Sequence, residues 1–136
     1  MDITVKNLQR SIPVSLAKTK TTALKACSSL KLLKSFLNVS IVFVAPGRMR
    51  SINKKYLGHD YVTDVITFDL GDGNAEILIC PQVASANAKI HQEPLTKELL
   101  LYVVHGLLHL AGYDDHMPDD IQQMRLKEKK LLKDSS

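Results

Sequence analysis

Two histidines near the C-terminal end of the chain, His105 and His109, stand four residues apart. They follow an apolar run, Leu99 to Val104, which is typical of a buried helix. Residues at this spacing are neighbours on a helix surface, with Cβ atoms about 5 to 6 Å apart. Both imidazoles can therefore reach one cation at about 2.0 to 2.1 Å. The pair predicts a metal site on this helix.

A third ligand is available just after the pair. Gly112 falls where the helix should end, because glycine readily adopts the positive φ of a sharp turn. Such a turn would bring Asp114, Asp115 or His116 back over the histidines. Histidine pairs on apolar helices can also be purely structural. The cluster favours a metal, because buried imidazoles need polar partners and a shared cation supplies them.

The spacing is similar to the zincin pattern His-Glu-x-x-His-x-x-Gly-x-x-His, in which the third ligand comes ten residues after the first. The glutamate of that pattern is the general base of metalloproteases. Gly106 stands in its place here. Glycine can neither accept nor donate a side-chain proton, so the sequence argues against a protease.

The stretch from His105 to His116 resembles the signature His-Gly-x-x-His-Leu-x-Gly-Tyr-Asp-His of the YbeY family of metal-dependent endoribonucleases. Residues 59–68 are similar to the family segment Asp-x-Pro-Thr-Asp-Val-Leu-Ser-Phe, and the resemblance covers about residues 39–132. It implies a zinc-dependent endoribonuclease with one Zn²⁺ per chain. It also implies a substrate, single-stranded RNA at the immature 3′ end of small-subunit (16S) ribosomal RNA, and a role with the ribosome or its small subunit in maturation and quality control.

The third-ligand position departs from the family signature. Many members carry a histidine ten residues after the first ligand, whereas this chain has Asp115 there and His116 one residue later. The following Pro118-Asp119-Asp120 keeps the family register without an insertion, so the resemblance favours Asp115 over His116. Two histidines and one carboxylate are an ordinary catalytic zinc set. We therefore expect His105, His109 and Asp115 to be the metal ligands and catalytic residues, with His116 as the alternative.

A second departure is Leu57, where the family usually has an arginine after the tyrosine. If that arginine binds phosphate, another cation must replace it. The densest basic group of the chain is the candidate for RNA backbone contacts, although it could equally be a solubilising face. Its members are Arg48, Arg50, Lys54 and Lys55.

Three protein ligands would leave a metal position open for water, whose pKa a catalytic zinc lowers to about 7. Hydroxide could then attack a phosphodiester, or the metal could activate a ribose hydroxyl; the sequence leaves both open. Two other functions compete with the endoribonuclease. One is a non-catalytic, ribosome-associated RNA-binding factor with a structural metal held by both Asp115 and His116. The other is a metal-dependent hydrolase of another substrate, such as a peptide.

Composition sets the broad class. The chain has 136 residues, of which 45% are hydrophobic, so we expect one domain over 1–136. Its net charge of +4 is compatible with a polyanionic partner. Cys27 and Cys80 follow no ligand or disulfide spacing and are expected to be reduced core thiols. No apolar run approaches the ~20 residues that span a bilayer, and the N-terminus lacks signal-peptide features. We expect a cytoplasmic protein without membrane contact.

Periodicity places these residues on elements. Strands are predicted at 3–8, 38–45, 62–70 and 75–80, the last two as a hairpin, and helices at 14–33, 46–57, 81–92, from Thr96 and from Pro118. Asp64 and Glu76 are candidates for a carboxylate pair or for hydrogen bonding at strand ends. The fold class expected is α+β, a small mixed sheet of about four strands packed with about five helices. The metal site would lie on a central helix and the following loop.

Overall fold

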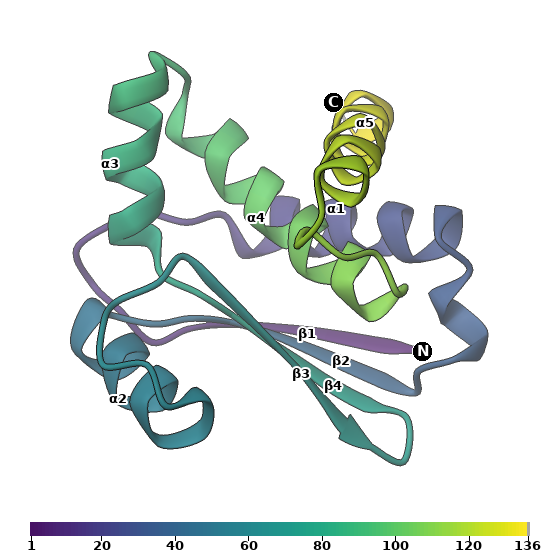
Figure 1. The fold of residues 1–136 in the computed structure, drawn as a ribbon, viewed down its shortest axis with the longest axis horizontal. Helices are drawn as coiled ribbons and strands as arrows, with labels where there is room; N and C mark the ends of the chain where they lie inside the picture. The colour runs from purple at the N-terminus through teal and green to yellow at the C-terminus, as the bar shows by residue number, and fades with distance from the viewer. Residues whose placement is uncertain (136) are drawn as a thin grey trace.

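The computed structural model describes residues 1–135, which form a four-stranded mixed sheet with helices on both faces (Figure 1). The order of the strands is β1-β2-β4-β3; β1, β2 and β4 are parallel and β3 is antiparallel to β4. The predicted mixed sheet is confirmed, and so is the predicted hairpin, which β3 and β4 form at one edge of the sheet. The strands are β1 (Asp2–Asn7), β2 (Asn38–Phe43), β3 (Val65–Gly71) and β4 (Asn74–Ile79).

Five α-helices and one short 3-10 helix complete residues 1–135, so the α+β class is also confirmed. The predicted helix 14–33 was too long. It ends at Ser29, and Lys31 then adopts a left-handed backbone with φ 59° before the 3-10 helix begins. The helices are α1 (Leu16–Ser29), η1 (Leu32–Lys34), α2 (Pro46–Leu57), α3 (Pro81–His91), α4 (Leu95–Leu110) and α5 (Pro118–Ser135).

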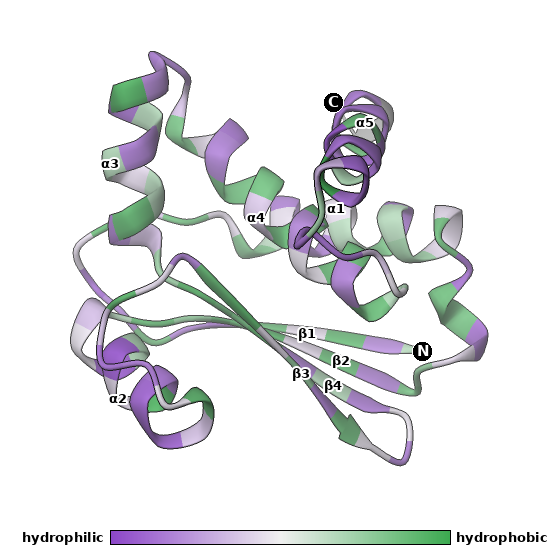
Figure 2. Ribbon diagram, viewed as in Figure 1, coloured by the Kyte–Doolittle hydropathy of each residue, from purple (hydrophilic) through white to green (hydrophobic). Residues whose placement is uncertain are grey.

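The central strand β2 is apolar on both faces because each face contacts a different helix layer. Val39, Ile41 and Phe43 pack into a large core with α1, α3, α4 and α5. Val42 and Val44 pack into a smaller core with α2 on the other face. Figure 2 shows hydrophobic residues concentrated in the strands and hydrophilic ones along much of α2 and α5. The sheet therefore separates α2 from the layer that carries the histidines.

Helix α4 lies in the middle of the large core and packs closely on β4. Gly106 makes this approach possible, since a Cβ at that position would lie 2.7 Å from Cγ2 of the buried Ile77. Gly106 stands where the zincin pattern has a glutamate. The same glycine thus lets α4 contact the sheet.

Two local expectations for the helices were wrong. Helix α4 begins at Leu95 rather than Thr96, and its N-cap is Pro94, which has no hydrogen-bonding side chain. On α5, Met124 and Leu131 are buried as expected, whereas Ile121 is exposed. In the described part of the chain, no helix combines the length and the hydropathy that crossing a membrane requires.

Candidate metal centre

His105 and His109 lie on the last turns of α4 with their Nε2 atoms 3.0 Å apart. Asp115 lies in the loop after the helix, and its Oδ2 atom is 3.6 Å from Nε2 of His105 and 3.9 Å from Nε2 of His109. The three ligand atoms all lie within 4.8 Å of one another, and the three residues are half-buried. The structure thus brings together the three side chains that the sequence favoured.

The turn after α4 brings Asp115 back over the histidines. Gly112 has φ 96°, its N–H donates to the carbonyl of His109 at 3.1 Å, and the N–H of Tyr113 donates to the carbonyl of Leu108 at 3.0 Å. These two bonds around a left-handed residue form a Schellman motif. The positive φ predicted for Gly112 is confirmed, and it reverses the chain within a few residues of the second histidine.

His116, the alternative third ligand, lies outside this trio. Its side chain is 83% exposed, and its Nε2 atom faces Oδ1 of Asp114 at 3.3 Å. Asp115 is 35% exposed and faces both histidines. Asp114, Asp115 and His116 form a second, more exposed group of potential ligands. In this structure Asp115, rather than His116, lies with His105 and His109 at the candidate centre.

Glu128 on α5 is part of the site, and sequence reasoning missed it. Its side chain is 2% exposed, its Oε2 atom lies 2.8 Å from Nδ1 of His105, and its Oε1 atom accepts a hydrogen bond from Arg125 at 2.9 Å. The available signal was its position, four residues after Met124 and three before Leu131, on the buried face of the helix. A glutamate there needs a buried partner.

This carboxylate orients the ring of His105. Burial would raise the pKa of Glu128, but hydrogen bonds from His105 and Arg125 outweigh it and hold the pKa below the usual value. An ionised carboxylate only accepts hydrogen bonds, so Nδ1 of His105 donates to Glu128 in this contact. The other ring nitrogen, Nε2, faces His109 and Asp115.

The second histidine is also held in a form suited to ligation. Burial, followed by the nearby His105, lowers the pKa of His109, although Asp115 and a backbone hydrogen bond to Tyr113 act in the opposite direction. His109 is therefore neutral at neutral pH. Two imidazole nitrogens and a carboxylate oxygen that face one another are a donor set that a divalent ion such as zinc satisfies.

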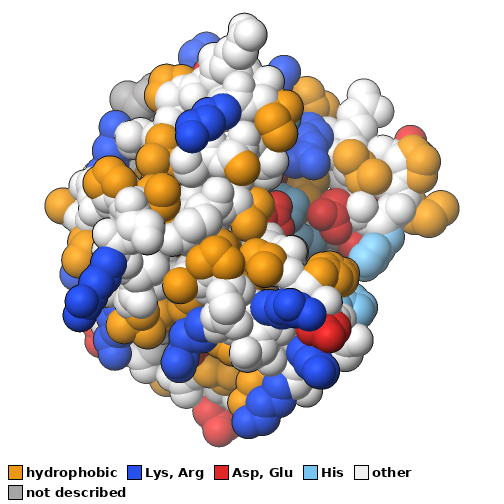
Figure 3. Space-filling view, turned by 90° about the vertical axis from the view of Figure 1, so that its left-hand side faces the viewer, with side chains coloured by type: hydrophobic (Ala, Val, Ile, Leu, Met, Phe, Trp, Pro, Cys, Tyr) orange, Lys and Arg blue, Asp and Glu red, His pale blue; other side chains and the backbone are white. Residues whose placement is uncertain are grey.

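A cleft opens beside Glu128, with a volume of about 570 Å³ and walls from α3, α4 and α5. Figure 3 shows histidine and acidic side chains gathered in a recess on one face of the molecule. Asp64, at the start of β3, lines the cleft, whereas Glu76 lines a groove on the α2 side of the sheet with Arg48. The strand register pairs Glu76 with Phe68, four residues beyond Asp64. The two carboxylates therefore do not form a pair.

The predicted basic group on α2 is separated from the histidines by the sheet (Figure 1). Two of its members contact Asp60, Arg50 at 2.8 Å and Lys54 at 3.8 Å. Lys55 lies 5.2 Å from the ring centroid of Tyr56. The exposed Leu57, at the family's arginine position, ends this helix. The fold does not bring this group to the candidate metal centre.

An α+β domain whose central helix carries two histidines, with a carboxylate folded back onto them, defines a class of candidate metalloproteins. A model of the family described as Endoribonuclease YbeY matches residues 2–136, and the chain belongs to this family.

Relatives agree with this family, and a solved structure shares the fold. The chain is 38% identical over 99 residues to Endoribonuclease YbeY of Chlorobium luteolum, an alignment that covers 71% of this chain and 72% of the relative. It is 42% identical over 94 residues to Endoribonuclease YbeY of Elusimicrobium minutum, covering 63% and 66%. The solution structure of TM1509 from Thermotoga maritima superposes with a TM-score of 0.68 at 28% identity, covering 98% of this chain and 89% of that one.

Proposed function

We propose that this chain is a metal-dependent endoribonuclease, a hydrolase that cleaves single-stranded RNA, formed by one domain over residues 1–136. The observation that carries the proposal is the convergence of His105, His109 and Asp115 in a protein of the endoribonuclease YbeY family. The proposed ion is zinc, one per chain, because two imidazoles and one carboxylate are a frequent catalytic zinc set.

Glu128 and Arg125 hold His105 in an orientation suited to a metal ligand. Glu128 holds the Nδ1 proton of His105, so that Nε2 is available as a ligand. Arg125 fixes the second oxygen of Glu128 and prevents its rotation away from His105. A metal held here would supply Lewis acidity toward a phosphoryl oxygen and a water of lowered pKa.

The competing functions fit this geometry less well. A peptidase of the zincin type needs a glutamate on the helix between its two histidines, and Gly106 packs there against Ile77 with no space for a larger side chain. A structural metal would need a fourth protein ligand. His116, the ligand suggested for that case, faces Asp114 instead of the histidines. These arrangements support an open, catalytic site.

We further propose that the substrate is ribosomal RNA. Cleavage would mature the 3′ end of 16S RNA, with a role in quality control of the small subunit in the cytoplasm. The groups Arg48, Arg50, Lys54 and Lys55 are proposed to contact RNA that extends to the α2 face of the sheet.

Substrate class can be tested with the purified, zinc-loaded chain. We expect cleavage of a single-stranded RNA that carries an extended 16S 3′ end, and much slower cleavage of the same sequence annealed to its complement. A casein or peptide substrate should remain intact. Peptide cleavage without RNA cleavage, or a zinc-loaded chain that cleaves neither, would contradict the proposal.

A further inference from the structure

The face of the sheet that packs on α2 holds a pocket outside the candidate metal centre. It has a volume of about 340 Å³ and lies between α2 and the hairpin of β3 and β4, which extends past the helix (Figure 1). Its apolar walls are Ile52, Phe68, Leu70 and Leu78. Ligand sites typically have about 300 to 1,000 Å³ and mostly apolar walls with a few polar groups. We call this hollow the hairpin pocket.

Three polar side chains complete the hairpin pocket. Arg48 and Tyr56 come from α2, and Glu76 comes from β4. Within residues 1–135, none of the three side chains makes a hydrogen bond or an ion pair. A guanidinium, a phenol ring and a carboxylate thus line one apolar hollow, and each has its polar groups available to a ligand.

Glu76 is the most informative of these side chains. It lies on β4, which is flanked by β2 and β3, and it is half-buried opposite Phe68 in the strand register. Removing a carboxylate from water is costly unless hydrogen-bond donors replace the lost water. No such donor comes from the described residues. The position therefore fits a ligand that carries N–H groups.

Tyr56 offers a surface for a planar ring. It is 60% exposed, and its ring meets the ring of Phe68 edge to face, with 5.8 Å between the centroids. Bases of single-stranded RNA stack on aromatic side chains, and hydrogen bonds then read their edges. Guanidinium groups bind phosphate oxygens. The three polar side chains therefore match the parts of a nucleotide: its base, the donors of that base, and its phosphate.

We propose that the hairpin pocket binds a guanine of the RNA substrate, with the base on Tyr56, its N1–H and N2–H groups donating to Glu76, and a neighbouring phosphate on Arg48. This inference rests on the proposed function and adds a base-specific contact on the α2 face. A carboxylate only accepts hydrogen bonds. Guanine alone among the RNA bases has two neighbouring nitrogen donors on its Watson–Crick edge. Glu76 therefore selects guanine over the other three bases.

The position of β3 relates this pocket to the histidines. It is an edge strand, which α4 contacts on one face of the sheet while the hairpin pocket opens on the other. A flexible single strand can pass round this edge. The pocket then selects a base that lies away from the cleaved bond.

Fluorescent uridine tracts that differ only in one central base, guanine or adenine, test the proposal. Their affinity is measured with EDTA present, so that no cleavage occurs. The variants are Glu76→Gln, with the exposed Asp69→Asn of the same hairpin as its control, and Tyr56→Ala, with Tyr56→Phe as its control. The two altered positions have no hydrogen bond to lose, so the variants should fold.

We expect the unaltered chain and Asp69→Asn to bind the guanine tract about tenfold more tightly than the adenine tract, because two hydrogen bonds to one base edge discriminate by about this much. Glu76→Gln should lose this preference. Tyr56→Ala should bind both tracts about tenfold more weakly, and Tyr56→Phe should bind them normally. A preference that Glu76→Gln retains, or unchanged binding by Tyr56→Ala, would overturn the inference.

A free guanine nucleotide is the other source of the same chemistry. GMP should bind at least about tenfold more weakly than the guanine tract, because it lacks the neighbouring phosphates. Equal affinity for GMP and the tract would overturn the assignment to RNA.

Cleavage of the same tracts with zinc separates this inference from the proposed function. If the unaltered chain cleaves single-stranded RNA but binds both tracts equally, only the guanine assignment is wrong. If it neither binds nor cleaves single-stranded RNA, the proposed function fails, and the guanine assignment is refuted with it.

Discussion

Nδ1 of His105 lies 2.8 Å from Oε2 of Glu128, a carboxylate that is almost fully buried beneath the candidate metal centre. The contact joins α4 to α5 across 23 positions of the sequence. It fixes the orientation of the His105 ring and the direction in which Nε2 points. The C-terminal helix therefore supports the site, although it supplies none of the three proposed ligands.

Replacing this carboxylate should weaken metal binding while the ligands remain. For Glu128→Gln we expect zinc affinity to fall about 10- to 100-fold, because carboxylate partners of ligating histidines orient the ring and raise its basicity. Isothermal titration calorimetry with zinc measures the effect, and circular dichroism checks the fold. Asp69→Asn, an exposed change of the same charge on β3, is the control. Equal affinities for the two variants would refute this role.

Gly106 should be more important for stability than its helix propensity suggests. Alanine is normally preferred over glycine in a helix by about 1 kcal/mol, but the new Cβ would lie 2.7 Å from Ile77 in a fully buried contact. Overpacking of this kind costs about 1 to 3 kcal/mol. We expect Gly106→Ala to lower the free energy of unfolding in urea.

The control for that substitution is Gly47→Ala on α2. No heavy atom among the described residues, apart from the adjacent backbone, lies within 4 Å of a Cβ at this exposed position. Its stability should stay the same or rise slightly. If Gly106→Ala were as stable as Gly47→Ala, the close packing of α4 on β4 would be wrong.

Both cysteines should be unreactive until the chain unfolds. Burial raises the pKa of Cys27 to about 11 and also raises the pKa of Cys80. The thiolate is the reactive species, and both side chains are fully buried. We expect no reaction with a disulfide reagent at mildly alkaline pH in native buffer, and reaction of two thiols per chain in denaturant. Rapid labelling of the native protein would contradict the burial of these residues.

The identity of the third ligand can be tested by replacing each of the two candidates with alanine. Asp115→Ala should lose most of its zinc affinity because its carboxylate faces both histidines, whereas His116→Ala should keep it. Metal content after dialysis, measured by atomic absorption, decides between them. The opposite pattern would make His116 the ligand and would leave the histidine pair unaffected.

Local features of the site could be predicted from the sequence, and long-range ones could not. The spacing of His105 and His109 and the turn at Gly112 depend on one helix and its end, so a short stretch contains the whole signal. The contact with Glu128 depends on how α5 packs on α4. A pattern within one helix shows that Glu128 is on the buried face but not which residue it meets.

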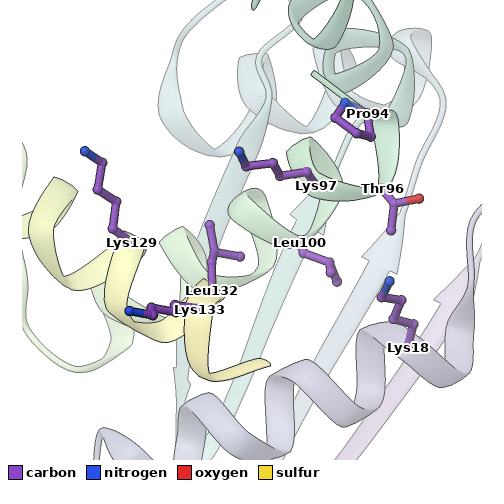
Figure 4. Close-up of a pocket in the computed structure, with 8 residues that line it drawn as sticks. All are labelled: Lys18, Pro94, Thr96, Lys97, Leu100, Lys129, Leu132 and Lys133. Atoms are coloured by element: carbon purple, nitrogen blue, oxygen red, sulfur yellow. The ribbon is translucent and has the colours of Figure 1, made fainter. Parts of the chain in front are cut away.

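The basic residues show the same difference between features that are local in the sequence and features that depend on the fold. The basic group of α2 is conspicuous because its members are close in sequence, but the sheet separates it from the histidines. By contrast, the lysines that line a pocket of about 510 Å³ come from three helices, α1, α4 and α5, and are brought together only by the fold (Figure 4). Similarly, the strand register separates Asp64 from Glu76, although the hairpin that contains them was predicted.

The proposed metal centre is tested by measuring zinc binding and RNA cleavage together in the unaltered chain and in His109→Ala. His109 contributes one of the three converging ligand atoms, and it lacks the Glu128 contact that makes His105 important for packing as well. We expect one zinc to bind per chain and zinc to restore cleavage of single-stranded RNA after chelation. His109→Ala should lose both properties while remaining folded. A folded His109→Ala protein that retains stoichiometric zinc and full RNA cleavage would contradict the proposed metal centre.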